Sequence, residues 1–400
     1  AHGGGTLLRN AGVITSSGGI LATGGGNQIV NAGAILGRGL WAVSVLSLPA
    51  EAASTLENTG TIAGLATAVV IGAEGFLLTS SGRIEATADA LVIEGNGGVV
   101  ANSGTIAGGA SAIRILSVEG GGTLLVNSGS IEAPVAIFGR TGSETIINEG
   151  LIAGLVQLDG GADRYDGTAG RLTALLELGG GNDTASGGAG NETLDGGAGS
   201  DTYDGARAVG PLAVDLGAGT LTGAGDGTDR LIGFENLIGS AFADTLKGSA
   251  ADNRMDGGEG GDGLYGGAGE DTISGGESAD FLRGGTGMDV LTGGDGADRF
   301  DLNSVADSGP KSSQRDIVTD FTHGVDLLDL KTIDANSERS GNQRFKLIGE
   351  KDFGDTAREL RVVYTETAAI LHGDLDGDGK AEFSVKLLGV ASLSAADLVL

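Results

Sequence analysis

The stretch from Gly239 to Asp301 reads GSAFADTLK, GSAADNRMD, GGEGGDGLY, GGAGEDTIS, GGESADFLR, GGTGMDVLT and GGDGADRFD, one nine-residue unit repeated seven times. Every unit begins with glycine and carries Asp or Asn at its sixth position. The eighth residues are all apolar: Leu246, Met255, Leu264, Ile273, Leu282, Leu291 and Phe300. So much glycine disfavours both a helix and an ordinary strand, and the period itself must therefore determine the fold.

The chemistry of the unit favours calcium. Glycine lets backbone carbonyls converge without a Cβ in the way, and Ca²⁺ takes about six to eight oxygen ligands from carboxylates and carbonyls. Two units complete a coil, so residues 18 apart stack. The stacks are a first column (Asp244, Asp262, Asp280, Asp298), a second column (Asn253, Asp271, Asp289) and an upstream column (Asp183, Asp201) with Glu192 opposite. We expect about six ions between adjacent turns, the best-formed one between Asp271 and Asp289.

The unit resembles the RTX, or hemolysin-type, calcium-binding repeat G-G-x-G-x-D-x-U-x, where U is a large apolar residue. This resemblance implies a parallel β-roll with Ca²⁺ in its glycine turns. The glycines expected to line these turns are Gly258, Gly260, Gly267, Gly269, Gly285 and Gly287. GSAFADTLK and GSAADNRMD lack glycine at positions two and four, so the roll ends should bind poorly. In GGESADFLR, Ser278 stands where the family has glycine. The alternative is that the Asp residues only cap glycine turns.

A different repeat, of the form N-x-G-x-I, occupies the N-terminal part of the chain. It begins at Asn10, Asn31, Asn58, Asn102, Asn127 and Asn148, with a degenerate copy, SSGRI, at Ser80. The steps of 21 to 27 residues, with short apolar strands between Gly/Asn corners, predict the coils of a parallel β-helix. We expect the Ile and Val of each N-x-G-x-I phrase to point inward and the Asn side chains to form a ladder of hydrogen bonds between coils.

These repeats predict an all-β chain. A right-handed parallel β-helix over residues 1–157 leads into a first repeat block at 158–204, a connector at 205–238, the calcium-binding β-roll at 239–301 and a C-terminal β capping region at 302–400. That tail resembles the C-terminal region of serralysin-type proteins, which caps the roll and carries an uncleaved type I secretion signal. The ending Asp397, Leu398, Val399 and Leu400 resembles the family's terminal acid and three apolar residues. A plain terminal strand is the alternative for these four residues.

A second type of calcium loop is predicted in the tail. Asp374, Asp376 and Asp378, followed by Gly379, form D-x-D-x-D-G, the front half of an EF-hand loop. The twelfth position is Val385 rather than Glu, so the loop is not a complete EF-hand. We expect a separate Ca²⁺ site here, with a plain acidic turn as the alternative.

Charge and composition limit the partners. The net charge is −29, of which −24 falls on residues 151–400, so nucleic acid and anionic membranes are disfavoured as partners. The absence of cysteine excludes disulfides and thiolate metal sites, and no apolar run approaches the roughly 18 residues of a membrane span. No classical signal peptide is visible at the N-terminus. Folding coupled to Ca²⁺ would suit passage unfolded through a type I exporter and folding at the cell surface or in the medium.

The sequence favours a structural function over a catalytic one. The chain has three histidines and no H-E-x-x-H, so the zinc protease activity of serralysins does not carry over. Secreted mannuronan epimerases join RTX modules to a β-helix, but their Asp-Pro-His-Glu motif is missing, and residues 1–157 hold one Asp and no Lys or Tyr. We expect a non-catalytic scaffold: an adhesin, matrix or surface-layer component that self-assembles or binds cell-surface polysaccharide. The alternative is a polysaccharide-modifying lyase or epimerase.

Overall fold

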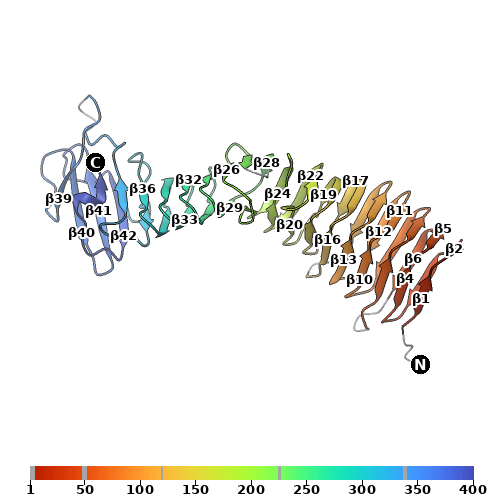
Figure 1. Cartoon of the computed structure of the whole chain (residues 1–400). Helices are drawn as coiled ribbons and strands as arrows, with labels where there is room; N and C mark the ends of the chain where they lie inside the picture. The colour runs from red at the N-terminus through yellow and green to blue at the C-terminus, as the bar shows by residue number, and fades with distance from the viewer. Residues whose placement is uncertain (1–4, 47–51, 119, 224–226, 337–339) are drawn as a thin grey trace. The chain divides into compact units, whose positions relative to one another are not determined.

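The computed structural model describes residues 5–46, 52–118, 120–223, 227–336 and 340–400. The regular secondary structure of those residues is almost all β-strand, and most of the strands pair in parallel, which confirms the all-β solenoid (Figure 1). The chain forms two compact units, Ala1–Tyr203 with Gly225–Phe234, and Asp204–Ala224 with Glu235–Leu400. The five-part division expected from sequence stays a prediction.

Each coil of the first unit begins with a strand that follows a turn. These strands are β1 (Leu7–Asn10), β4 (Gln28–Asn31), β7 (Thr55–Asn58), β10 (Leu77–Ser80), β13 (Gly98–Asn102), β16 (Thr123–Asn127), β18 (Thr145–Asn148), β20 (Arg164–Asp166), β23 (Thr184–Ser186) and β25 (Thr202–Asp204). They pair in parallel and in register, so that Ile29, Leu56, Leu78, Val100, Leu125 and Ile146 stack inside the coils. All six are buried, and this stack is the core of the β-helix.

The rest of each coil in this unit is formed by a second set of strands. They are β2 (Val13–Ser16), β3 (Ile20–Thr23), β5 (Ala34–Gly37), β6 (Trp41–Leu46), β8 (Thr61–Gly64), β9 (Thr67–Gly72), β11 (Arg83–Ala86), β12 (Asp89–Ile93), β14 (Thr105–Gly108), β15 (Ser111–Ile115), β17 (Ser130–Phe138), β19 (Leu151–Gln157), β21 (Arg171–Leu172), β22 (Leu175–Gly181), β24 (Thr193–Gly199) and β28 (Gly227–Ile232). The phrase isoleucines from Ile35 to Ile152 are buried as expected. Val13 is the exception: it is 71% exposed, because side chains alternate along β2 and its neighbour Ile14 takes the inward direction.

The expected asparagine ladder is formed by the first residues of the N-x-G-x-I repeats and is interrupted at Ser80. The side-chain amide of Asn10 donates to Asn31 Oδ1 at 2.8 Å, and Asn31 donates to Asn58 in the same way. The pattern resumes from Asn102 to Asn127 at 2.8 Å and onward to Asn148. These bonds satisfy buried amides between coils, which is the structural role that the repeat predicts.

The second unit contains the roll and the tail. Its strands are β26 (Leu212–Asp215), β27 (Thr220–Gly223), β29 (Asn236–Ile238), β30 (Thr245–Lys247), β31 (Arg254–Gly258), β32 (Gly263–Ala268), β33 (Thr272–Glu277), β34 (Phe281–Thr286), β35 (Val290–Asp295), β36 (Arg299–Asp301), β37 (Ile317–Val318), β38 (Leu327–Asp329), β39 (Lys346–Gly349), β40 (Glu359–Tyr364), β41 (Ala368–Asp374), β42 (Phe383–Leu388) and β43 (Leu398–Val399), with a short 3-10 helix η1 (Ala395–Asp397) before the last strand.

The roll keeps the period of 18 residues in space. Leu246, Leu264, Leu282 and Phe300 pair in sequence along one side, and Met255, Ile273 and Leu291 along the other. All of these eighth-position side chains are at most 1% exposed. The strands are longer than the three residues that the unit suggests: β33 runs six residues, because backbone pairing continues through the glycines of the next unit.

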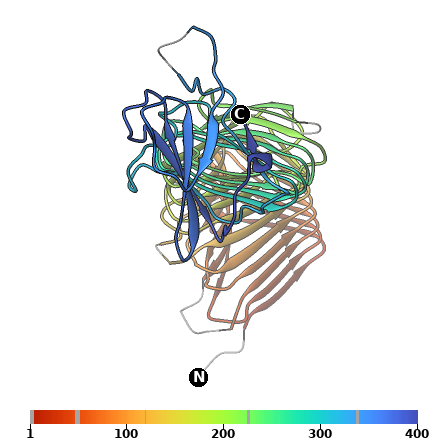
Figure 2. The same ribbon diagram turned by 90° about the vertical axis from the view of Figure 1, so that its left-hand side faces the viewer.

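The tail adds an antiparallel sheet to the parallel coils. β41 lies between β40 and β42, and β42 also pairs in parallel with β37, which follows the last roll strand of its side. Figure 2 shows the blue strands of the tail in front of the teal coils of the roll. These strands therefore cover the end of the roll core. Among the residues that the structure describes, no helix has the length and apolar character needed to cross a membrane.

Candidate metal-binding columns

Hydrogen bonds across the coils align the predicted ligand residues. In the first column the amides of Asp244, Asp262 and Asp280 each donate to Oδ1 of the next Asp, at 2.7, 2.7 and 3.0 Å. In the second column Asn253 donates to Asp271, and Asp271 to Asp289, both at 2.8 Å. One carboxylate oxygen of each stacked Asp is thus used to join adjacent turns.

The other carboxylate oxygen of these residues lacks a partner. Oδ2 is buried and has no hydrogen bond within the described residues at Asp183, Asp262, Asp271, Asp280, Asp289 and Asp298. Each of these side chains is at most 3% exposed. Leaving a buried charged oxygen unsatisfied costs about 1–3 kcal/mol or more, and a cation bound beside this repeated row of oxygens would remove that cost.

A second oxygen beside the Asp Oδ2 atom comes from the backbone carbonyl of the glycine that begins a nine-residue repeat one coil further on. A Cβ placed on Gly266 would lie 2.2 Å from Asp271 Oδ2 and 2.5 Å from the carbonyl oxygen of Gly284, one coil further on. Gly275 repeats this arrangement with Asp280 and the Gly293 carbonyl, at 2.3 and 2.4 Å. A carboxylate and a carbonyl therefore converge on a point that only glycine leaves open, which fits a hard cation such as Ca²⁺.

The glycines that sequence analysis singled out have a related role. Gly258, Gly260, Gly267, Gly269, Gly285 and Gly287 all have φ between 99 and 146°, in the region that favours glycine. They shape the turns, whereas the carbonyls beside the Asp side chains are those of position one. That position could have been found from the sequence, because it is the one glycine that all seven units retain.

The columns also extend past the repeats, where sequence analysis did not place them. Asp289 donates to Asp316 Oδ1 at 3.0 Å, and Asp298 donates to Asp326 Oδ1 at 2.9 Å. In the first compact unit of the chain, the Glu192 amide donates to Asp229 Oδ1 at 2.7 Å. These partners lie 27, 28 and 37 residues along the chain, so the 18-residue step could not reveal them.

The two nine-residue repeats that lack glycine at position two differ in structure from the other repeats. Ser240 occupies that position in GSAFADTLK, and its amide and hydroxyl donate to the two Asp244 oxygens at 2.5 and 2.8 Å. In GSAADNRMD the Ser249 amide donates to Asn253 Oδ1 at 2.6 Å. Protein donors therefore occupy the oxygens that are unpaired elsewhere in the column.

Burial sets the electrostatics of the metal-free columns. It raises the pKa of Asp271 and Asp280 to about 7, with the charges of neighbouring carboxylates adding to the rise and a backbone hydrogen bond opposing it. The same causes raise the pKa of Asp262 and Asp289 to about 6, and burial raises that of Asp316 to about 9. Near neutral pH protons and cations therefore compete for the same oxygens.

The structure brings the D-x-D-x-D residues together. Single carboxylate oxygens of Asp374, Asp376, Asp378 and Glu382 lie within 4.8 Å of one another. Asp374 is buried and accepts the amides of the loop, including Gly377 at 2.6 Å, while Lys380 Nζ lies 2.6 Å from Asp378 Oδ2. Glu382 is the ninth residue of the loop. The sequence pattern did not indicate it, because an EF-hand loop has its glutamate ligand at the twelfth position.

The C-terminal residues belong to the folded tail. Asp397 is fully buried and accepts the Ser394 amide at 2.6 Å, the Gly324 amide at 2.8 Å and a contact from His323 Nδ1 at 2.9 Å. Leu398 and Val399 form β43, which pairs in parallel with β38. Leu400 follows this strand at the chain end.

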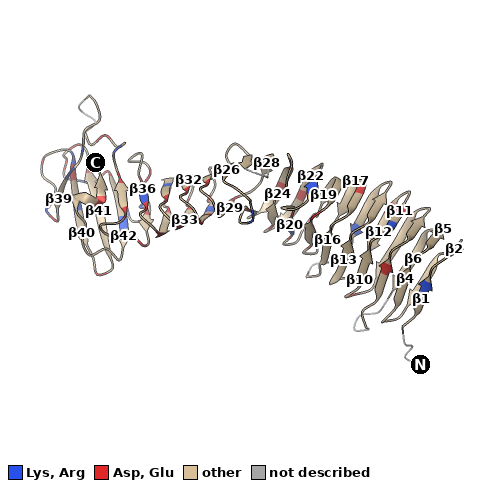
Figure 3. Cartoon of the chain, viewed as in Figure 1, with Lys and Arg blue, Asp and Glu red and all other residues tan. Residues whose placement is uncertain are grey.

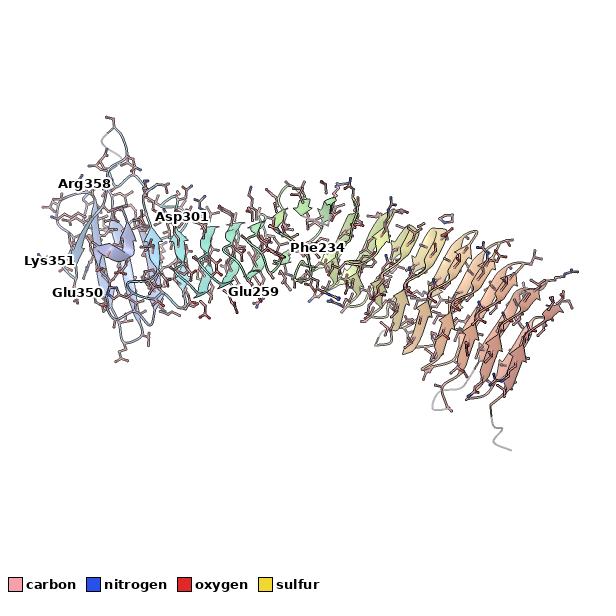
Figure 4. The ribbon with its side chains drawn as sticks, viewed as in Figure 1. Phe234, Glu259, Asp301, Glu350, Lys351 and Arg358 are labelled. Carbon is pink, nitrogen blue, oxygen red and sulfur yellow. The ribbon has the colours of Figure 1, made fainter. Side chains whose placement is uncertain are left out.

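Charged groups are sparse on the β-helix coils (Figure 3). A shallow groove runs across β7, β10, β13 and β16, lined by Ser, Thr, Asn, Ala and Val side chains and one acid, Glu57. Elsewhere Arg114 pairs with Asp89 at 3.1 Å and lies over the ring of Phe138, 5.7 Å from its centre. Acidic side chains such as Glu259 are instead frequent and exposed along the roll (Figure 4).

One family model agrees with the resemblance noted in the sequence. None of the curated proteins matches the chain. Among solved structures, the AlgE6R2 and AlgE6R3 subunits of the mannuronan C5-epimerase from Azotobacter vinelandii are each 28% identical, cover 41% and 40% of this chain and 92% and 78% of their own, and have TM-scores of 0.24 and 0.21. The extracellular lipase LipA from Serratia marcescens is 16% identical over 77% of this chain and 45% of its own, with a TM-score of 0.26. The model of the peptidase M10 serralysin C-terminal family matches residues 136–400, more than half of the sequence, and the chain therefore belongs to that family.

Proposed function

We propose that the protein is a secreted, non-catalytic scaffold whose coils are held by several Ca²⁺ ions. The observation that carries this proposal is the row of buried, unpaired Asp Oδ2 atoms, which at Asp262, Asp271 and Asp280 face a glycine carbonyl of the next coil. Asp183, Asp201 and the Asp members of the first and second columns other than Asp244 would hold the ions, with Asp316 and Asp326 at the C-terminal end. Ca²⁺ would supply charge neutralisation between turns, while protein bonds already satisfy Asp244.

The acidic loop of the tail is proposed as a separate Ca²⁺ site. Asp374, Asp376, Asp378 and Glu382 supply four carboxylates from one turn, in the oxygen-rich arrangement that Ca²⁺ prefers. Lys380 shares Asp378 in the absence of an ion and would have to leave it. This loop is independent of the columns, so its occupancy can be measured with a variant of its own, Asp376→Asn.

Calcium dependence also suggests how the protein leaves the cell. Serralysin-type C-terminal regions are associated with type I secretion. Without Ca²⁺ the stacked carboxylates oppose folding, so the chain would cross the exporter unfolded and fold outside. The Asp397 to Leu400 ending, of which Leu398 and Val399 form a strand of the folded tail, would be available to the exporter only before folding.

The scaffold assignment concerns the β-helix. The groove across β7, β10, β13 and β16 is lined mainly by Thr, Ser, Asn and apolar side chains, which suits an adhesin, a matrix protein or a surface-layer component. The rival is a lyase or epimerase, which would need a base, an acid and a cation in one groove. Incubation of the full chain with uronate polymers and Ca²⁺ tests the difference: no turnover is expected, and any turnover contradicts the non-catalytic function.

A further inference from the structure

Two buried carboxyl groups lie where the β-helix meets the first repeat block, one in the last β-helix coil and one at the start of the block. Glu144 stands just before β18 and Asp163 just before β20, and they are 0% and 2% exposed. The Glu144 amide donates to Asp163 Oδ1 at 2.6 Å, and the Asp163 amide donates to Asp183 Oδ1 at 2.7 Å. The upstream column of acids thus begins two coils earlier than the repeat suggests, inside the β-helix.

Each of these residues keeps one oxygen without a partner. Ser117 Oγ donates to Glu144 Oε1, which holds the carboxylate in place. Among the residues that the structure describes, no N–H or O–H group donates to the buried Glu144 Oε2 or Asp163 Oδ2. The two carboxyl groups are close enough to hydrogen-bond to each other when one of them holds a proton. Burial raises the pKa of both groups, that of Asp163 to about 8, with the nearby charges of Glu144 and Asp183 contributing.

The surroundings of Glu144 repeat those of the roll. A Cβ on Gly139 would lie 3.2 Å from Glu144 Oε2 and 3.0 Å from the carbonyl oxygen of Leu158 in the next coil. This is the pair of oxygens that the roll presents at Gly266, with a Glu in place of the Asp. The local sequence GRTGSETII has glycine at positions one and four, an acid at six and Ile146 at eight, so it is a degenerate unit within the N-x-G-x-I coils.

We propose that Glu144 and Asp163 bind a hard divalent cation, Ca²⁺, together with the Leu158 carbonyl. The proposal rests on the proposed function in taking its cation from the same chemistry, but the residues and the coil are new. Asn148, the last member of the asparagine ladder, lies in the coil that Glu144 begins. The site would therefore make the last β-helix coils dependent on Ca²⁺, like the roll.

The test counts ions on the full chain. Equilibrium dialysis against Ca²⁺ compares the wild type, the double variant Glu144→Gln with Asp163→Asn, and the control Glu149→Gln, an exposed glutamate of the same coil. We expect the double variant to bind about one ion fewer per chain and the control to bind as many as the wild type. An unchanged ion count in the double variant would overturn the proposal.

A second measurement separates ligand loss from a structural defect. Without Ca²⁺ the amides replace two buried carboxyl groups whose charged forms burial disfavours, so the double variant should melt in chelator at or above the wild-type temperature. With Ca²⁺ its gain in melting temperature should be smaller than that of the wild type. An equal loss in both conditions would mean that the two acids are only structural. If the wild type binds no Ca²⁺ at all, the proposed function itself fails; if Asp271→Asn loses an ion and the double variant does not, only this site fails.

Discussion

At the scale of single residues, Gly266 separates the cost of a side chain from the cost of an unusual backbone. Its φ lies outside the left-handed region, yet a Cβ there would lie 2.2 Å from Asp271 Oδ2. Gly266→Ala should therefore reduce Ca²⁺ binding and the calcium-dependent gain in melting temperature. Gly263→Ala is the control, because its Cβ would meet only ordinary contacts at 3.4 Å and beyond. Calorimetric titration measures both, and equal affinities would contradict the role of position one.

Asp271 carries the second residue-scale prediction. Asp271→Asn keeps the shape of the side chain but removes the charge that faces Gly284 across the coils. We expect the Ca²⁺ concentration for half-maximal folding to rise about tenfold, which corresponds to about 1.4 kcal/mol. Asp256→Asn, at the exposed ninth position of its unit, should leave it unchanged. A shift of the same size in both variants would show that net charge, rather than a site, is responsible.

At the scale of the coil, the asparagine ladder has a gap at Ser80. Asn58 reaches Ser80 Oγ at 3.2 Å, and no bond joins the Ser80 and Asn102 side chains within the described residues, although all three are in register. Ser80→Asn should complete the ladder and stabilise the protein by about 1 kcal/mol. Thermal unfolding measures the gain, with the exposed Ser81→Asn as control. A lower melting temperature for Ser80→Asn would mean that the coil is closed to the longer side chain.

The same scale shows what sequence could and could not predict. Strict periods place Asn31 on Asn58 and Ile273 on Leu291, because each coil repeats the chain path of the last. Asp229, Asp316 and Asp326 escaped prediction because long excursions separate them from the residues they stack on. Val13 was misplaced because a phrase of five residues does not say which of two adjacent apolar residues faces inward.

At the scale of the whole molecule, pH and Ca²⁺ should act in opposite directions. The folded pKa values of about 6 to 7 for Asp262, Asp271, Asp280 and Asp289 exceed the ordinary value of 3.8, so the metal-free folded state holds more protons than the unfolded state. Its stability is therefore greatest at low pH and falls as pH rises through 6 to 7. Melting in chelator and in Ca²⁺ at about pH 5 and about pH 8 checks this. A metal-free protein that gains stability toward pH 8 would contradict the assigned burial of these acids.

Ion binding and folding of the chain should be coupled, because each unpaired oxygen of a column belongs to a coil that needs a cation to close. The most direct measurement is a Ca²⁺ titration of the full chain at neutral pH, starting in chelator, with circular dichroism and bound calcium recorded on the same samples. We expect a cooperative gain of β-structure as several ions bind per chain. A spectrum that is the same in chelator and in Ca²⁺, with no ion bound, would contradict it.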